Sequence, residues 1–208
     1  LEGSVAFENK ASHLDLDSDR IYNFLIGKAI YKNNFACLHE LLQNSVDAII
    51  DRFWLENKNI NLSINEFSKK LKNYRIDVYV ETIQIHEGKI EYKITISDNG
   101  KGMNIDDIKS MLTISSTDAQ KRKEKMREGM PNWMRPSGFF GIGIQSVFSL
   151  TEQLNIVTKS AGDSQYEIIF KLSKNRKPSF VVQKNESDDW KFGTSVSFSI
   201  FDSAIPNK

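Results

Sequence analysis

The spacing of apolar residues constrains this 208-residue chain most, because it changes once along the sequence, from helical to strand-like. Apolar residues first recur at intervals of three, four and seven, which predicts a helix from about Phe35 to Trp54. A helical spacing also begins earlier, at Ile21, after an Asp-rich stretch. The residues expected on the buried face of the longer helix are Leu38, Leu41, Leu42, Ile49 and Phe53.

From Ile76 onward the spacing of apolar residues becomes two. Alternation in 76–80 and 92–96, on either side of a turn at 86–89, predicts an antiparallel hairpin. Because helices come early, strands come late and the two do not alternate, we expect an α+β fold. The expected architecture is a two-layer α/β sandwich, with a mixed, mostly antiparallel sheet covered by helices on one face. The further strands are predicted near 154–159, 166–172, 179–183 and 194–201.

Composition excludes several classes of protein. The chain has 28 Lys and Arg against 27 Asp and Glu, and a net charge of +1 predicts no general attraction to nucleic acid or anionic lipid. The single Cys37 excludes an intramolecular disulfide and a cysteine-based zinc cluster. Neither a membrane-spanning apolar run nor a signal peptide is recognisable, so we expect a cytoplasmic protein. We expect residues 1–208 to form a single domain cut from a longer protein.

Four polar residues share one side of the predicted long helix. At about 100° per residue, Glu40, Asn44, Asp47 and Asp51 fall within about 60° of one another. Such a stripe by itself is typical of a solvated helix face. Asn44, however, is a mediocre helix former, and an amide oxygen beside a carboxylate suits Mg²⁺ in a phosphate site.

The sequence DNGKGM, residues 98–103, follows the second strand of the predicted hairpin. Two glycines let the backbone turn sharply and let a flat ligand approach it closely. The plainer interpretation is an Asp-Asn-Gly turn that closes a strand. A buried carboxylate at Asp98 would nevertheless accept a hydrogen bond from the exocyclic amine of adenine, and would select adenine over guanine.

Glycines also precede a helix-compatible segment at 145–150. Gly138, Gly141 and Gly143 would expose backbone N–H groups near the positive end of a helix, which favours binding of phosphates. Their spacing matches neither the dinucleotide nor the P-loop fingerprint. Residues 104–137 have a weak core pattern, which predicts a mobile flap.

Read in order, the motifs are ExxxNxxDA from Glu40, DxGxGM from Asp98, GxxGxG from Gly138, and a late Gly-Thr that ends in Thr194. Together they resemble the GHKL superfamily of ATPases, the Bergerat fold shared by gyrase, ninety-kilodalton heat-shock chaperones, sensor histidine kinases and MutL. The chaperone branch is the most similar, through HELL at 39–42 and GFFGIGIQSVF. The resemblance implies a domain that binds Mg-ATP and hydrolyses it slowly to drive a chaperone-like conformational change, with 104–137 as the ATP lid.

Residue roles follow from this resemblance position by position. Glu40 would be the general base that activates water, and Asn44 would be the protein ligand of Mg²⁺. Asp98 would accept the adenine amine, assisted by Thr194 through water. The other nucleotide contacts implied are Asp47, Ala48, Gly102, Met103, Gly138, Gly141, Gly143 and Ile144.

The sequence departs from the pattern of the chaperone branch at two positions. His39 stands where the chaperone branch has arginine, and Ile144 stands where it has an aromatic residue. The resemblance implies ATP and ADP as ligands. It also implies a downstream domain that supplies a catalytic Lys or Arg side chain, and an ATP-dependent homodimer. The alternatives are a sensor-histidine-kinase-type catalytic domain and a MutL- or gyrase-like ATPase acting on DNA. The basic run 121–127 near Trp133 prompts a nucleic-acid module, but solvated loops commonly carry such runs, so nucleic acid is not an expected partner.

Overall fold

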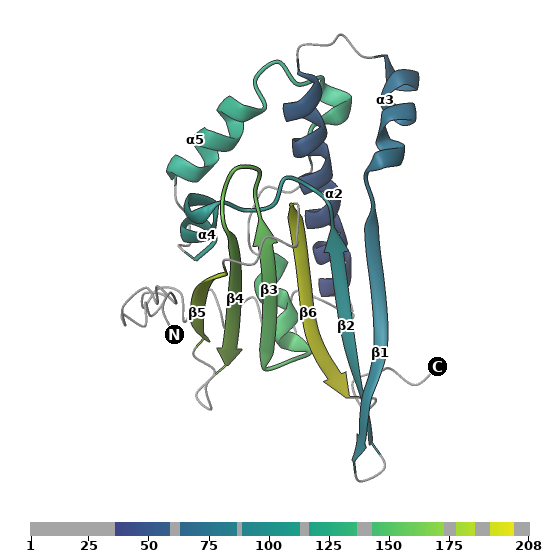
Figure 1. The fold of residues 1–208 in the computed structure, drawn as a ribbon, viewed down its shortest axis with the longest axis vertical. Coiled ribbons are helices and arrows are strands. Elements are labelled where there is room, and N and C mark those ends of the chain that lie inside the picture. The colour runs from purple at the N-terminus through teal and green to yellow at the C-terminus, as the bar shows by residue number, and fades with distance from the viewer. Residues whose placement is uncertain are drawn as a thin grey trace.

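One six-stranded antiparallel sheet forms the body of the molecule in the computed structural model (Figure 1). The strands are β1 (Ile76–His86), β2 (Lys89–Asp98), β3 (Gln153–Lys159), β4 (Gln165–Leu172), β5 (Pro178–Asn185) and β6 (Gly193–Phe201). Their order is β1-β2-β6-β3-β4-β5. Every pairing among the described strands is antiparallel. The predicted α+β class is confirmed, and the described strands include none of the parallel pairs that a mixed sheet would have. The structure describes residues 36–58, 63–86, 89–112, 117–136, 143–172, 178–185 and 192–201, so the helical spacing at Ile21 lies outside them.

Helices cover one face and the upper end of the sheet (Figure 1). They are α2 (Ala36–Asn57), α3 (Ile64–Lys70), α4 (Ile105–Leu112) and α5 (Thr117–Met126), with 3₁₀ segments η1 (Leu71–Asn73), η2 (Asn132–Met134) and η3 (Gly143–Ser149). The predicted long helix is confirmed as α2 and extends to Asn57. α3 was not predicted. It begins after Ser63, whose side chain and Glu66 form a capping box. No helix in the described part of the chain has the length and apolar character needed to cross a membrane.

The alternation of burial along the strands places the main core between the sheet and α2. Ile94 and Ile96 of β2 face this core, together with Leu41 of α2. The prediction that Leu42 is buried was wrong, because Leu42 lies about 100° around the helix from Leu41 and is 37% exposed. A second cluster consists of Phe53, Trp54, Met130 and Met134.

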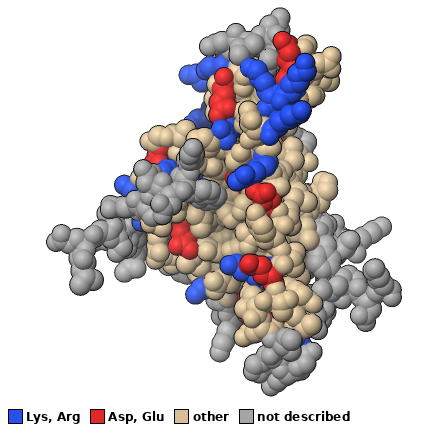
Figure 2. Space-filling model, turned by 45° about the vertical axis from the view of Figure 1, so that its right-hand side comes forward, with Lys and Arg blue, Asp and Glu red and all other residues tan. Residues whose placement is uncertain are grey.

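Positive charge is concentrated at the end of the molecule that carries α3 and α5. Residues 51–75 and residues 117–136 each hold six Lys or Arg against three Asp or Glu, although the whole chain has a net charge of only +1. Figure 2 shows Lys and Arg gathered at the upper end, where α3 and η1 carry Lys69, Lys70 and Lys72. The remainder of the chain is therefore acidic in net.

Candidate functional site

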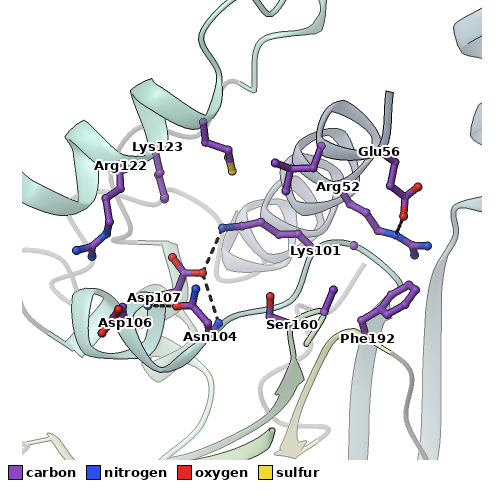
Figure 3. Close-up of a pocket in the computed structure, with 14 residues that line it drawn as sticks. Arg52, Glu56, Lys101, Asn104, Asp106, Asp107, Arg122, Lys123, Ser160 and Phe192 are labelled. Carbon is purple, nitrogen blue, oxygen red and sulfur yellow. Dashed lines mark hydrogen bonds and ion pairs between the residues drawn. The ribbon is translucent and has the colours of Figure 1, made fainter. Parts of the chain in front are cut away.

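The turn after β2 is pressed against α2. A Cβ atom at Gly100 would lie 2.7 Å from the Cβ of Ala48 and 2.8 Å from Oδ1 of Asp98. Gly102 has a φ of +65°, and a Cβ there would lie 1.9 Å from the carbonyl oxygen of Lys159. Both positions therefore need glycine. The backbone N–H of Lys101 donates to the carbonyl of Ala48 at 3.0 Å, and this turn forms part of the wall of a pocket between α2 and α5 (Figure 3).

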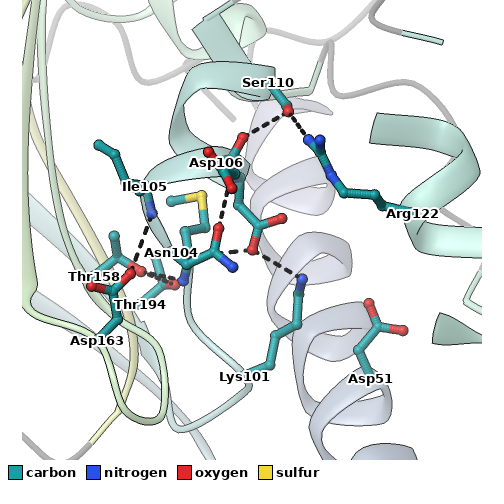
Figure 4. Close-up of polar contacts among 12 residues, drawn as sticks. Asp51, Lys101, Asn104, Ile105, Asp106, Ser110, Arg122, Thr158, Asp163 and Thr194 are labelled. Atoms are coloured by element: carbon teal, nitrogen blue, oxygen red, sulfur yellow. Dashed lines mark hydrogen bonds and ion pairs between the residues drawn. The ribbon is translucent and has the colours of Figure 1, made fainter. Parts of the chain in front are cut away.

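Three strands contribute a row of polar side chains at one end of the sheet. Asp98 of β2 is the register partner of Thr194 of β6, which is in turn the partner of Thr158 of β3. The Thr158 hydroxyl lies 3.0 Å from that of Thr194 and accepts a hydrogen bond from the N–H of Met103 at 2.9 Å (Figure 4). Thr158 is fully buried, so it ties the turn after β2 to β6. Sequence reasoning missed Thr158, because its partners depend on strand register.

Asp98 is a buried acid, 7% exposed. Its Oδ1 accepts a hydrogen bond from the N–H of Gly100 at 2.8 Å. Burial raises the pKa of Asp98 to about 6, against the lowering effect of hydrogen bonds from Gly100, the Ser45 side chain and the Thr194 backbone. A carboxylate with so little water around it is a strong acceptor for a hydrogen-bond donor on a ligand. Ser45, also missed from the sequence, lies one residue after Asn44 on α2.

The polar stripe of α2 is not a uniformly solvated face. Glu40 is half-buried and Asn44 is exposed, whereas Asp47 and Asp51 are buried. Gln43 donates to Asp47 at 2.8 Å. Asp51 forms an ion pair with Arg127, from the segment after α5. Glu40, Asn44 and Ala48 follow one another at intervals of four residues, so they lie along one side of α2, and Ala48 contacts the turn.

Asp51 and Arg127 form a bidentate ion pair of 2.8 and 2.9 Å. Next to it, the indole N–H of Trp54 donates to the carbonyl of Met126 at 2.9 Å. These contacts fasten the segment that follows α5 to the C-terminal half of α2. The predicted flap 104–137 therefore includes a firmly packed part.

The predicted phosphate cradle falls largely outside the described residues. Gly138 and Gly141 lie outside them. Gly143 begins η3, a 3₁₀ segment, and the half-buried side chain of Ile144 packs against the main core. The structure thus brings together Ala48, Asp98, Gly102, Met103 and Thr194, with Glu40 and Asn44 further along α2.

Comparisons with known proteins show which family this chain resembles. A family model described as histidine kinase-, DNA gyrase B-, and HSP90-like ATPase matches residues 31–194. The chaperone protein HtpG of Fusobacterium nucleatum subsp. nucleatum is 26% identical over 186 residues, which are 84% of this chain and 28% of that protein. Heat shock protein 90 of Encephalitozoon cuniculi is 26% identical over 201 residues, 94% of this chain and 27% of that protein.

The chain thus spans about a quarter of the length of these two relatives. The resemblance drawn from the four motifs is confirmed, because the matched region contains α2, the turn after β2 and the start of β6. This chain belongs to the histidine kinase-, DNA gyrase B- and HSP90-like ATPase family, close to its HSP90 branch.

Proposed function

We propose that this domain binds Mg-ATP through Asp98 and hydrolyses it slowly. The observation that carries the proposal is the buried Asp98 carboxylate, which is held by the Gly100 N–H at the foot of the turn. The exocyclic amine of adenine donates a hydrogen bond, whereas the carbonyl of guanine at the same place would face the carboxylate oxygen. Burial makes this discrimination strong, because an unmatched buried acceptor costs about 1–3 kcal/mol.

The residues of α2 supply the groups proposed for hydrolysis. Glu40 would accept the proton of the attacking water, and a half-buried carboxylate at the start of the stripe fits that role. The amide of Asn44 is exposed, so its oxygen fits a cation that keeps most of its waters. Mg²⁺, when bound, would neutralise charge on the phosphates. The backbone of Gly138, Gly141, Gly143 and Ile144 would donate to the phosphates, Thr194 would contact adenine through water, and Asp47, Ala48, Gly102 and Met103 would line the pocket.

Nucleotide binding would be coupled to closure of residues 104–137 over the site. The relatives carry the names of chaperones and are about four times as long as the stretch matched here. We therefore propose a chaperone-type protein in which a Lys or Arg side chain of a further domain contacts the γ-phosphate. ATP would promote formation of a homodimer. The isolated domain would then bind ATP better than it hydrolyses it.

Calorimetric titration with Mg-ATP, combined with phosphate-release assays, tests these roles. We expect Asp98→Asn to abolish measurable ATP binding, and Glu40→Ala to retain it while losing hydrolysis. Asp77→Asn is the matched control, since this carboxylate lies on β1 and pairs with Arg75 at 3.1 Å. Unchanged ATP affinity in Asp98→Asn would refute the adenine assignment.

A further inference from the structure

The pocket between α2 and α5 is distinct from the place proposed for adenine. It has a volume of about 330 Å³ and is lined by residues of α2, α4, α5 and the turn after β2 (Figure 3). Asp98, Met103 and Thr194 do not line it. The cationic residues of its wall are Arg52, Lys101, Arg122 and Lys123.

Two of the carboxylates around this pocket are already engaged. Glu56 pairs with Arg52 at 2.7 Å, and the Arg52 guanidinium lies 3.9 Å from the centroid of the Phe192 ring. Asp107 lies 3.3 Å from the Lys101 ammonium. The contact with Asp107 uses one of the three N–H donors of Lys101, so this ammonium can still donate to a ligand. Neither pair involves the cations of α5.

The third carboxylate of the wall, Asp106, lies 3.9 Å from Lys109. On α5, Arg122 donates to the hydroxyl of Ser110 at 2.6 Å, which is a neutral partner (Figure 4). Among the described side chains, none forms an ion pair with Lys123. The pocket therefore has an excess of positive charge on its α5 side.

Lys123 and Lys101 act on each other across the pocket. Lys123 is exposed along part of its length. Desolvation, and then the charges of Lys101 and Arg127, lower the pKa of its ammonium, and the charges of Asp51 and Asp107 only partly oppose them. An anion held between the two ammonium groups would remove this repulsion and make charge-assisted hydrogen bonds to both. Leu55 and Phe192 provide apolar surface beside them.

We propose that this pocket binds a phosphate group between Lys101 and Lys123. The phosphate would come either from the nucleotide or from a separate small phosphate compound. Because Lys101 belongs to the turn after β2 and Lys123 to α5, the bound phosphate would fasten α5 over the turn. This effect on the lid rests on the proposed function, whereas the phosphate site itself does not.

Calorimetric titration with pyrophosphate, in EDTA and at fixed ionic strength, tests the site. We expect saturable binding to the wild-type domain, weakened about tenfold by Lys123→Gln and by Lys101→Gln. Lys125→Gln is the matched control on α5, because Lys125 does not line the pocket. Asp98→Asn should bind pyrophosphate as the wild type does while losing ATP.

The ATP titration of the same variants identifies the source of the phosphate. If Lys123→Gln weakens both ligands, the nucleotide supplies the phosphate; if it weakens pyrophosphate alone, a separate compound does. Pyrophosphate binding that survives both lysine substitutions, or that Asn44→Ala removes instead, would overturn the proposal. A wild-type domain that binds pyrophosphate but not ATP would contradict the proposed function and leave this site standing.

Discussion

Asp98 should destabilise the nucleotide-free domain at neutral pH, and its replacement by asparagine should reveal this cost. Burial raises the pKa of Asp98 from 3.8 to about 6. Between these values the folded protein binds a proton more readily than the unfolded chain does, so the free energy of unfolding falls as pH rises through this window. Above about pH 6 the ionised carboxylate lowers stability by about 3 kcal/mol.

Asparagine keeps the shape of the side chain and an oxygen for the Gly100 N–H, but it does not titrate. We expect the stability of Asp98→Asn relative to the wild type to increase by about 1.4 kcal/mol between pH 5 and pH 7.5. This increase reports the charge alone, because altered hydrogen bonds shift the difference equally at both values of pH. Urea unfolding of the nucleotide-free proteins, followed by tryptophan fluorescence, measures it.

Asp77→Asn provides the control, since the Asp77 carboxylate is solvent-accessible and pairs with Arg75 at the surface of β1. A stability difference for Asp98→Asn that is equal at pH 5 and pH 7.5 would refute the reasoning. The combination of gained stability and lost ATP binding would also separate a binding carboxylate from a structural one, which loses both on substitution.

Three other substitutions test the architecture around Asp98. Gly102→Ala should destabilise the fold by more than about 2 kcal/mol, about twice the effect of Gly162→Ala, as compared by thermal unfolding. Both residues have positive φ, but a Cβ at Gly102 would lie 1.9 Å from the Lys159 carbonyl oxygen, whereas one at Gly162 would meet nothing within 4 Å. Thr158→Val should cost about 1–3 kcal/mol and weaken ATP binding, whereas Thr158→Ser should restore both, and equal defects in the two variants would argue against the hydroxyl. Asp51→Ala should cost about 3–5 kcal/mol by stranding Arg127, and a loss below 1 kcal/mol in urea unfolding would show that the pair is not buried in solution.

The strands of this fold were predictable because burial alternates along them as the residue types do. In β2, Ile94, Ile96 and Asp98 are all buried, so the period of two that predicted the hairpin also placed Asp98 on the core side. α3 was missed, although Ser63 and Glu66 carry the capping-box signature, because its residues are too polar to produce an apolar spacing.

The side chains that hold the site could not be predicted in the same way. Thr158 contacts Met103 across 55 positions, and Asp51 pairs with Arg127 across 76. Such pairs depend on strand order and on the path of the chain after α5, neither of which a local pattern encodes. The motifs could be recognised in the sequence because each is local, whereas the adjacency of Asp98 and Thr194 at one end of the sheet is a property of the strand order.

The segment proposed as a lid divides at Arg127. Before it, Lys121 and Lys125 on α5 are exposed, so displacing that helix would expose little additional apolar surface to water. After it, Met130 and Met134 are each 3% exposed against Trp54, and each contributes about 1.5–3 kcal/mol by burial. Detaching that part would cost more than the coupling of about 1–3 kcal/mol that a ligand commonly supplies. Ile108 of α4 is 1% exposed in the main core, so the same argument holds α4 in place. Closure on ATP would therefore move α5 and leave α4 and the residues from Arg127 onward attached to the body of the fold.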